Sequence, residues 1–221
     1  GEGLPDEILI QEANNNLDIV EHQGRVYFAF RTAPEHFASD QTELHIVSSM
    51  NQETWTHEVS FSQGTDLREP RFLSLGDRLF LYFAVLGDNP LAFEPQGSRV
   101  SVLEEGSWSE AAEVFDADFI PWRARVVDHI PMLMGYTGGG EIYDLDGELP
   151  QIEVKWLTTT DGLEWEALVS GQETVHTGGG SETDAASHGR GVGCIDLGCN
   201  PGPTPAKPAS SAGVDLDASS G

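Results

Sequence analysis

The chain has 221 residues, enough for one sizeable core, and carries a formal net charge of -26 with a pI near 4.3. This excess of carboxylates opposes any approach to phosphate, so nucleic acid and anionic membrane surfaces are excluded as partners. The sequence also lacks a run of about 18 apolar residues, which excludes insertion of a helix into a membrane.

Composition divides the chain into three parts. We expect residues 1–13 to form an N-terminal strand or closure segment, and residues 14–183, rich in aromatic and β-branched residues, to form the globular part. Residues 184–221 are mostly Gly, Ala, Ser, Pro and Asp, which predicts a disordered tail. Both cysteines lie in that tail, and a core without thiols is typical of an exported protein, so we expect an extracellular or periplasmic location.

Within the globular part the same pattern occurs three times, at residues 17–33, 70–86 and 122–138. Each segment holds an extended stretch, a short turn and a second apolar run. The turns contain Gly24, Gly76-Asp77 and Asp128-His129, residue types that a tight hairpin requires. The sequence therefore predicts three successive β-hairpins.

A polar loop and a third strand follow each hairpin, and a tryptophan stands seven positions after a hydroxyl residue at the end of that strand. The three pairs are Ser48 with Trp55, Ser101 with Trp108 and Thr158 with Trp165. A further apolar run after each tryptophan supplies a fourth strand. The repeating unit is thus a four-stranded antiparallel sheet, and the units span residues 14–61, 66–115 and 119–170.

Four-stranded units repeated in this way predict an all-β fold of the β-propeller class, in which the sheets, or blades, pack radially around a channel. The alternative is a β-sandwich, which also has many short strands. A sandwich gives no reason for one hairpin and one hydroxyl-to-tryptophan interval to recur. We therefore predict three propeller blades.

The hydroxyl residue, tight turn and tryptophan resemble the Asp-box of the sialidase-like, BNR-repeat propellers, whose pattern is Ser/Thr-x-Asp-x-Gly-x-x-Trp. In the third copy Thr158, Gly162 and Trp165 match, but the acid, Asp161, comes one position late. The first copy lacks both Asp and Gly, and the second shifts the glycine to position 106. The resemblance implies a structural turn and carries no catalytic role for these residues.

A fourth unit is due near Asp184, but the sequence that follows has neither alternation nor aromatic residues. Three blades cannot close a ring. The alternatives are a longer propeller of which this is a part, a reading frame altered near residue 184, or identical chains that complete one another; we favour the first two. Open blade edges also predict self-association.

The first strands of the blades line the channel of a propeller, and their starts share one rim with the ends of the second strands. Asp18, Arg71 and Arg123 are equivalent by alignment and are expected at that rim. Arginine binds carboxylates through its planar fork, so we predict a site for a carbohydrate or other small anionic ligand. Its predicted ligand-binding residues are Arg31, Arg68, Arg71, Arg123 and Trp122.

An alternative for the arginines is an ion pair between blades, with Glu69 and Asp66 as ready partners of Arg71 and Arg68. Trp122 is compatible both with sugar stacking and with packing between blades.

Two resemblances suggest a glycoside hydrolase instead. Arg68-Glu69-Pro70 is similar to the Arg-Ile-Pro element of sialidases, although it follows the first box-like turn. Asp18 and Glu69 resemble carboxylates of the five-bladed, invertase-like glycosidases, which implies catalytic roles for both; two carboxylates are the minimum for this reaction. For Asp18 the alternative is a residue that stabilises the strand entry.

The histidines do not fall into a metal-ligand spacing, and a phosphate-binding glycine loop is absent from the sequence, so we predict no metal and no cofactor. Our leading hypothesis is a propeller that binds an anionic glycan and is not catalytically competent alone. The alternatives are an exo-glycoside hydrolase and a protein-interaction scaffold.

Overall fold

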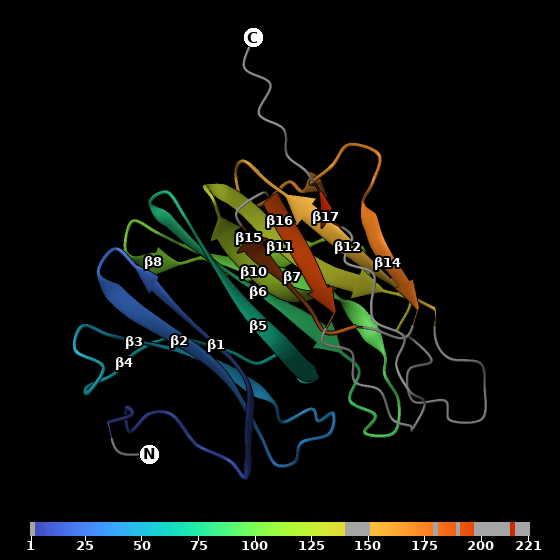
Figure 1. The fold of residues 1–221 in the computed structure, drawn as a ribbon. Coiled ribbons are helices and arrows are strands. Elements are labelled where there is room, and N and C mark those ends of the chain that lie inside the picture. The colour runs from blue at the N-terminus through green and yellow to red at the C-terminus, as the bar shows by residue number, and fades with distance from the viewer. Residues whose placement is uncertain (1–2, 140–150, 179–180, 189–190, 197–212, 215–221) are drawn as a thin grey trace.

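The structure is a computed structural model of the chain, and it describes residues 3–139, 151–178, 181–188, 191–196 and 213–214. These residues form antiparallel sheets that stand side by side in a fan, as the propeller prediction requires (Figure 1). The remainder of the predicted tail and residues 140–150 lie outside the described residues.

Each of three sheets is one blade. Blade 1 consists of β1 (Ala13–His22), β2 (Arg25–Ala33), β3 (Glu43–Ser49) and β4 (Thr56–Phe61). Blade 2 consists of β5 (Asp66–Leu75), β6 (Arg78–Leu86), β7 (Pro95–Glu104), β8 (Ser107–Trp108) and β9 (Ala112–Val114). Blade 3 consists of β10 (Ile120–Val127), β11 (Ile130–Thr137), β12 (Ile152–Thr158), β13 (Glu166–Ala167) and β14 (Thr174–Gly178).

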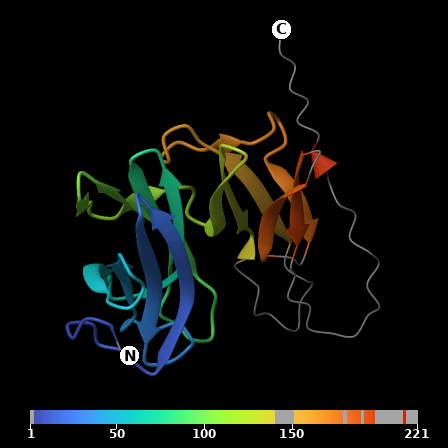
Figure 2. The same ribbon diagram turned by 60° about the vertical axis from the view of Figure 1, so that its left-hand side comes forward.

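The predicted hairpins open each blade, and their turns are tight. Gln23 and Gly24 both have positive φ, as do Asp128 and His129, which is the geometry that matches the twist of a two-residue hairpin. The first strands of the blades are neighbours in space: β1 lies against β5, and β5 lies against β10. They are therefore the inner strands of the fan (Figure 2).

The outer strands of blades 2 and 3 differ from the sequence prediction, because each is divided in two. In blade 3 a turn interrupts the strand, with Gly171 at φ +76° and the Gln172 amide donating to the Val169 carbonyl. The segment after this turn, β14, then pairs again with β12. A loop inserted in an edge strand costs little, since only one side of that strand is hydrogen-bonded.

The core lies between the blades. Strand β6 is a continuous apolar run because both faces of blade 2 are covered. Leu79, Leu81 and Phe83 belong to the cluster shared with blade 1, whereas Phe80 and Tyr82 belong to the cluster shared with blade 3. The outer face of blade 1 is covered in part by the N-terminal segment, where Leu4 and Ile8 pack on aromatic residues of β2.

A fourth sheet occupies the place where the sequence predicts only a tail. It consists of β15 (Thr183–His188), β16 (Gly191–Asp196) and β17 (Gly213–Val214), and β15 lies against β10 and β11 of blade 3. The residues of this hairpin have little strand propensity, so its formation depends on contacts with the rest of the fold. The inner edge of blade 3 supplies packing and two arginines for it.

Candidate functional site

The inner strands share an irregularity near their starts. The register shifts between Asn15 and Leu17 in β1, between Arg68 and Arg71 in β5, and between Pro121 and Arg123 in β10. These are β-bulges, which bend a strand and redirect its side chains. Three equivalent bulges on neighbouring strands therefore form one surface, which we call the channel mouth. It comprises Asn16, Asp18, Glu69, Arg71, Trp122 and Arg123.

Polar contacts join the three bulges in a chain. The Asn16 amide donates to Oε1 of Glu69, and Oε2 of Glu69 forms an ion pair with Nη2 of Arg71 at 2.5 Å. Nε of Arg71 donates to the backbone carbonyl of Trp122, and its guanidinium carbon lies 5.2 Å from the centroid of the Trp122 ring. The structure thus brings the predicted residues Glu69, Arg71 and Trp122 together. These contacts are contacts among protein groups.

Burial raises the pKa of the Glu69 carboxyl. The positive charges of Arg71 and Arg68 oppose this change, and the carboxylate of Glu182 adds to it. Glu69 is therefore a carboxyl that releases its proton at higher pH than an exposed glutamate does. Both of its oxygens accept hydrogen bonds within the protein.

Asp18 connects blade 1 to blade 2. Its Oδ2 accepts a hydrogen bond from the backbone amide of Phe72 at 2.7 Å. Burial raises the pKa of the Asp18 carboxyl, whereas this hydrogen bond and the charge of Arg71 lower it. This hydrogen bond joins two blades, and so differs from the local strand-entry contact that the sequence offered as an alternative to catalysis.

Arg123 is the more accessible arginine of the channel mouth, with a side chain that is 34 % exposed. Its Nε lies 3.6 Å from Oδ2 of Asp184, and Nη2 of Arg125 lies 2.7 Å from the same oxygen. The carboxylate at the start of β15 thus faces two arginines of β10. By contrast, Arg71 is 6 % exposed.

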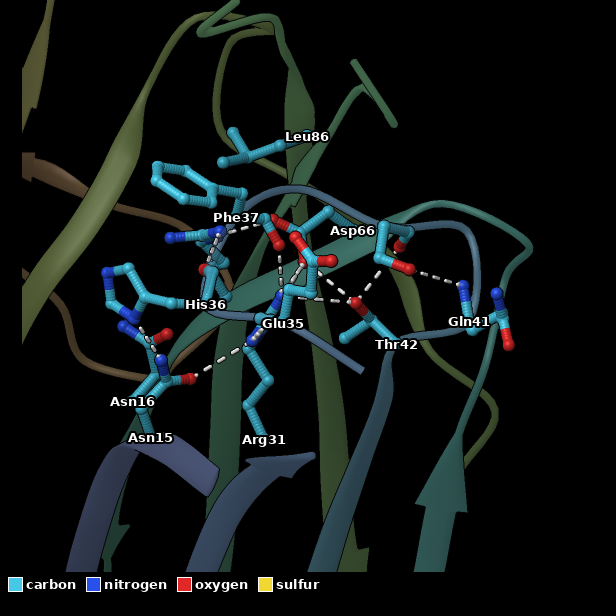
Figure 3. A network of polar contacts seen from close by, with 12 residues as sticks. Asn15, Asn16, Arg31, Glu35, His36, Phe37, Gln41, Thr42, Asp66 and Leu86 are labelled. Atoms are coloured by element: carbon cyan, nitrogen blue, oxygen red, sulfur yellow. Dashed lines mark hydrogen bonds and ion pairs between the residues drawn. The ribbon is translucent and has the colours of Figure 1, made fainter. Parts of the chain in front are cut away.

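Arg31 lies at the predicted end of blade 1, opposite Asn15 and next to the bulge of β1, but its side chain is not exposed there. It is fully buried, and its guanidinium donates to Asp66 at 2.7 and 3.0 Å and to the side chains of Asn15 and Thr42 (Figure 3). It also donates to the carbonyls of Glu35 and Phe37. Burial lowers the pKa of this guanidinium, and Asp66 opposes that effect. Arg31 holds the loop after β2 and has no donor left for a ligand.

Arg68 points away from Arg71. Its Nε donates to Oδ2 of Asp66, the second oxygen of the carboxylate that Arg31 contacts, and its Nη2 donates to the carbonyl of His36 at 2.6 Å. Both ion pairs that the sequence offered as an alternative, Asp66 with Arg68 and Glu69 with Arg71, are therefore present.

The repeated tryptophans connect the blades. Trp108 of blade 2 packs on Tyr27 of blade 1, and Trp165 of blade 3 packs on Tyr82 of blade 2. Trp55 of blade 1 packs within its own blade, on Phe28.

The hydroxyl that organises the turn is one residue later than the sequence indicated. In the third copy Thr159, not Thr158, accepts from the amides of Asp161 and Gly162, while Asp161 accepts from the amides of Leu163 and Glu164. Thr158 instead donates to the Pro131 carbonyl of the neighbouring strand. The acid that seemed one position late is thus in place relative to its hydroxyl.

The first copy differs in the same respect, whereas the second copy forms another kind of turn. Ser49, not Ser48, accepts from the amides of Asn51 and Gln52, so that Asn51 replaces the acid. Ser48 donates to Glu58. The second copy is a two-residue hairpin between β7 and β8 in which Ser101 donates to the Ser109 carbonyl.

Sequence reasoning missed two polar residues of this rim, Asn16 and Glu182, and it missed the pairing of Asp66 with Arg31. Asn16 has φ +49°, and asparagine directly before an apolar strand is a signal for such a conformation. The pairing of Asp66 with Arg31 carried no such signal, because the two residues are 35 positions apart in the chain. Among the described residues, His, Cys, Asp and Glu side chains do not gather in groups of three that could hold a metal ion.

Comparison with solved structures shows the fold. The chain is similar to the sialidase of Trypanosoma rangeli in complex with 2,3-difluorosialic acid, with a TM-score of 0.62 and 13 % identity over 83 % of this chain. It is similar to a protein of unknown function from Dyadobacter fermentans, with a TM-score of 0.59 and 15 % identity over 82 %. It is also similar to a family 117 glycoside hydrolase of Zobellia galactanivorans, with a TM-score of 0.56 and 15 % identity over 83 %.

The similar region is only part of each of these proteins. It covers 34 % of the sialidase, 61 % of the Dyadobacter protein and 62 % of the glycoside hydrolase. No protein-family model matches the chain, and no curated protein matches it in sequence. The chain therefore has the blade architecture of sialidase-like and glycosidase-like propellers. In the part of the chain that the structure describes, no helix is long and apolar enough to cross a membrane.

Proposed function

We propose that the chain binds an acidic sugar at the channel mouth, as a propeller of the sialidase-like superfamily. The observation that carries the proposal is the side chain of Arg123, which is 34 % exposed and follows Trp122 directly in the bulge of β10, where the guanidinium of Arg71 lies over the Trp122 ring. A guanidinium suits the carboxylate of an acidic sugar, and an aromatic ring suits its apolar face. In this proposal the ligand competes with Asp184 for Arg123.

The fold supports the choice of a sugar. One solved structure of the similar T. rangeli sialidase holds sialic acid, and it matches this chain with a TM-score of 0.63 at 12 % identity. The turns at Ser49–Trp55 and Thr159–Trp165 support the kinship further, since both use a hydroxyl and an Asn or Asp side chain to hold backbone amides in the Asp-box manner. A protein that recognises glycans outside the cell fits an extracellular or periplasmic location.

Binding is favoured over catalysis because both predicted catalytic carboxylates accept hydrogen bonds from groups of the protein. Asp18 accepts from the Phe72 amide, and Glu69 accepts from Asn16 and Arg71. A group that acts as nucleophile, acid or base needs a free oxygen directed at the substrate. In this arrangement both carboxylates serve the contacts between blades.

One observation favours glycoside hydrolysis as the second candidate. Burial raises the pKa of Glu69, and the charge of Glu182 adds to this change, so two carboxyl groups lie near one another at the channel mouth. Such a pair is what general acid catalysis of glycoside cleavage requires. Release of nitrophenol from a panel of nitrophenyl glycosides, lost in Glu69→Gln and in Glu182→Gln, would establish this candidate over simple binding.

The proposal is tested by calorimetric titration of the full chain with N-acetylneuraminic acid and with the neutral N-acetylglucosamine. We expect heat of binding for the acidic sugar only, and a loss of about tenfold in affinity in Arg123→Gln, the effect of one charged hydrogen bond. Arg99→Gln is the matched control, because it removes the same charge from blade 2, where Arg99 pairs with Glu113. Equal binding of both sugars would contradict the proposal.

A further inference from the structure

A pocket of about 390 Å³ opens between blades 1 and 2, beside the channel mouth. One wall is the loop after β2 of blade 1, and the other is the end of β6 with the loop that follows it in blade 2. Its lining is His36, Phe37, Ala38, Asp66, Arg68, Leu86, Pro90, Leu91, Ala92 and Phe93. A volume of this size, mostly apolar with few polar groups, is typical of small-molecule sites.

Two apolar side chains of the pocket are conspicuously exposed. Leu91 is 87 % exposed and Phe37 is 58 % exposed, and they come from opposite walls. Neither side chain is part of the core clusters that hold the blades together. Exposed apolar residues that converge on one pocket are characteristic of binding sites.

The floor of the pocket carries an excess of positive charge. Arg31 and Arg68 share the single carboxylate of Asp66, which leaves one positive charge unbalanced. The neighbouring pair of Glu69 and Arg71 is neutral, and Glu182, the further carboxylate near Glu69, does not line the pocket. A partly buried, unbalanced charge is costly and is stabilised by a counter-ion.

Arg68 is the group that can present this charge. Its Nε and Nη2 are bound to Asp66 and to the His36 carbonyl, whereas its Nη1 has no hydrogen-bond partner among the described residues. Its side chain is 15 % exposed and lines the pocket. Asp88 and Glu94, the carboxylates of the loop after β6, do not line it. Figure 3 shows Phe37 and Leu86 near one another beside the Arg31 and Asp66 network, and both side chains line the pocket.

We propose that this pocket binds a small apolar molecule that carries one carboxylate, with the apolar body between Phe37 and Leu91 and the carboxylate on Nη1 of Arg68. The site is separate from the channel mouth, because its walls are the loops at the blade 1 and blade 2 junction and its cation is Arg68. It does not depend on the proposed sugar site.

The test uses 2-naphthoate as the probe and naphthalene-2-methanol as its neutral counterpart, titrated against the full chain by calorimetry. We expect 2-naphthoate to bind at least tenfold more tightly than the alcohol, and this preference to disappear in Arg68→Gln. Leu91→Ser, at a position too exposed to affect folding, should weaken both ligands. Arg123→Gln should leave naphthoate binding unchanged and reduce only the binding of acidic sugar, so failure of one site does not imply failure of the other.

Equal affinity for the acid and the alcohol would overturn the proposal, because the guanidinium would then play no part. Unchanged naphthoate binding in Leu91→Ser would overturn it as well, since the probe would lie elsewhere. The melting temperature of Arg68→Gln shows whether that variant is folded; if it is not, the comparison of acid with alcohol and the Leu91→Ser result still decide.

Discussion

Gly162 holds the third turn in a conformation that other residues adopt only with strain. Its φ is +79°, and a Cβ atom built there would lie 2.5 Å from the ring of Phe80 in the neighbouring blade. Gly162→Ala should therefore lower the free energy of unfolding by about 3 kcal/mol, from backbone strain and overpacking together. Gly24→Ala is the matched control, because Gly24 has φ +76° with nothing within 4 Å, and should cost about 1 kcal/mol. Urea unfolding measures both; equal losses would contradict the contact with Phe80.

Asp66 is the residue whose removal should destabilise the protein most. It is fully buried, and two arginines depend on it. Asp66→Asn leaves these charges unpaired and should cost about 3 to 5 kcal/mol. Glu113→Gln is the control: Glu113 is 84 % exposed in its ion pair with Arg99, so it should change stability by less than about 1 kcal/mol. Similar losses in the two variants would show that the Arg31 and Asp66 network contributes little.

Glu69 gives the stability of the protein a predictable pH dependence. Because its pKa is raised from 4.5 in the folded protein, the folded state keeps a proton that the unfolded chain releases. The contribution of Glu69 to stability is therefore greatest at low pH and is lost as the pH rises from 4.5 through the raised pKa. Unfolding measured between pH 4 and 8 should show a smaller decline with pH in Glu69→Gln than in the unchanged protein. Parallel curves would contradict the assignment.

At the scale of elements, the hairpins that depend on neighbouring residues were predicted from the sequence. The elements that depend on contacts between distant residues were not. The hairpins β1–β2, β5–β6 and β10–β11 follow from alternation and from turn residues such as Gly24, which are properties of neighbouring residues. The hairpin β15–β16 has no such pattern and depends on blade 3. The ion pairs of Arg68 and Arg71 were predicted because their partners lie two residues away, whereas those of Arg31 and Arg125 were not, because Asp66 and Asp184 lie far from them in the chain.

The hairpin β15–β16 should depend on Asp184 in particular. Its carboxylate faces Arg123 and Arg125, so Asp184→Asn weakens the contact of β15 with β10. Trypsin cleavage after Arg190, between the two strands, should then accelerate by up to about fivefold, the effect expected of a partly exposed ion pair. Glu113→Gln should cleave at the unchanged rate. An unchanged rate in Asp184→Asn would mean that packing alone holds the hairpin.

At the scale of the whole molecule, the bulges of the inner strands and the turns that carry the tryptophans lie on opposite sides of the blades. The bulges of β1, β5 and β10 lie at the starts of the inner strands, whereas the tryptophan turns follow the third strands at the other end of each blade. The fold thus separates a rim of arginines and carboxylates from turns that join the blades. The central claim is that the first of these surfaces binds an acidic sugar.

Hydrogen exchange of the full chain, with and without saturating N-acetylneuraminic acid, tests this claim most directly. The account predicts slower exchange in the segments at residues 69–72 and 119–125, and unchanged exchange in the turns at residues 49–55 and 159–165. Protection confined to those turns, or no protection at the channel mouth under conditions where calorimetry detects binding, would contradict it.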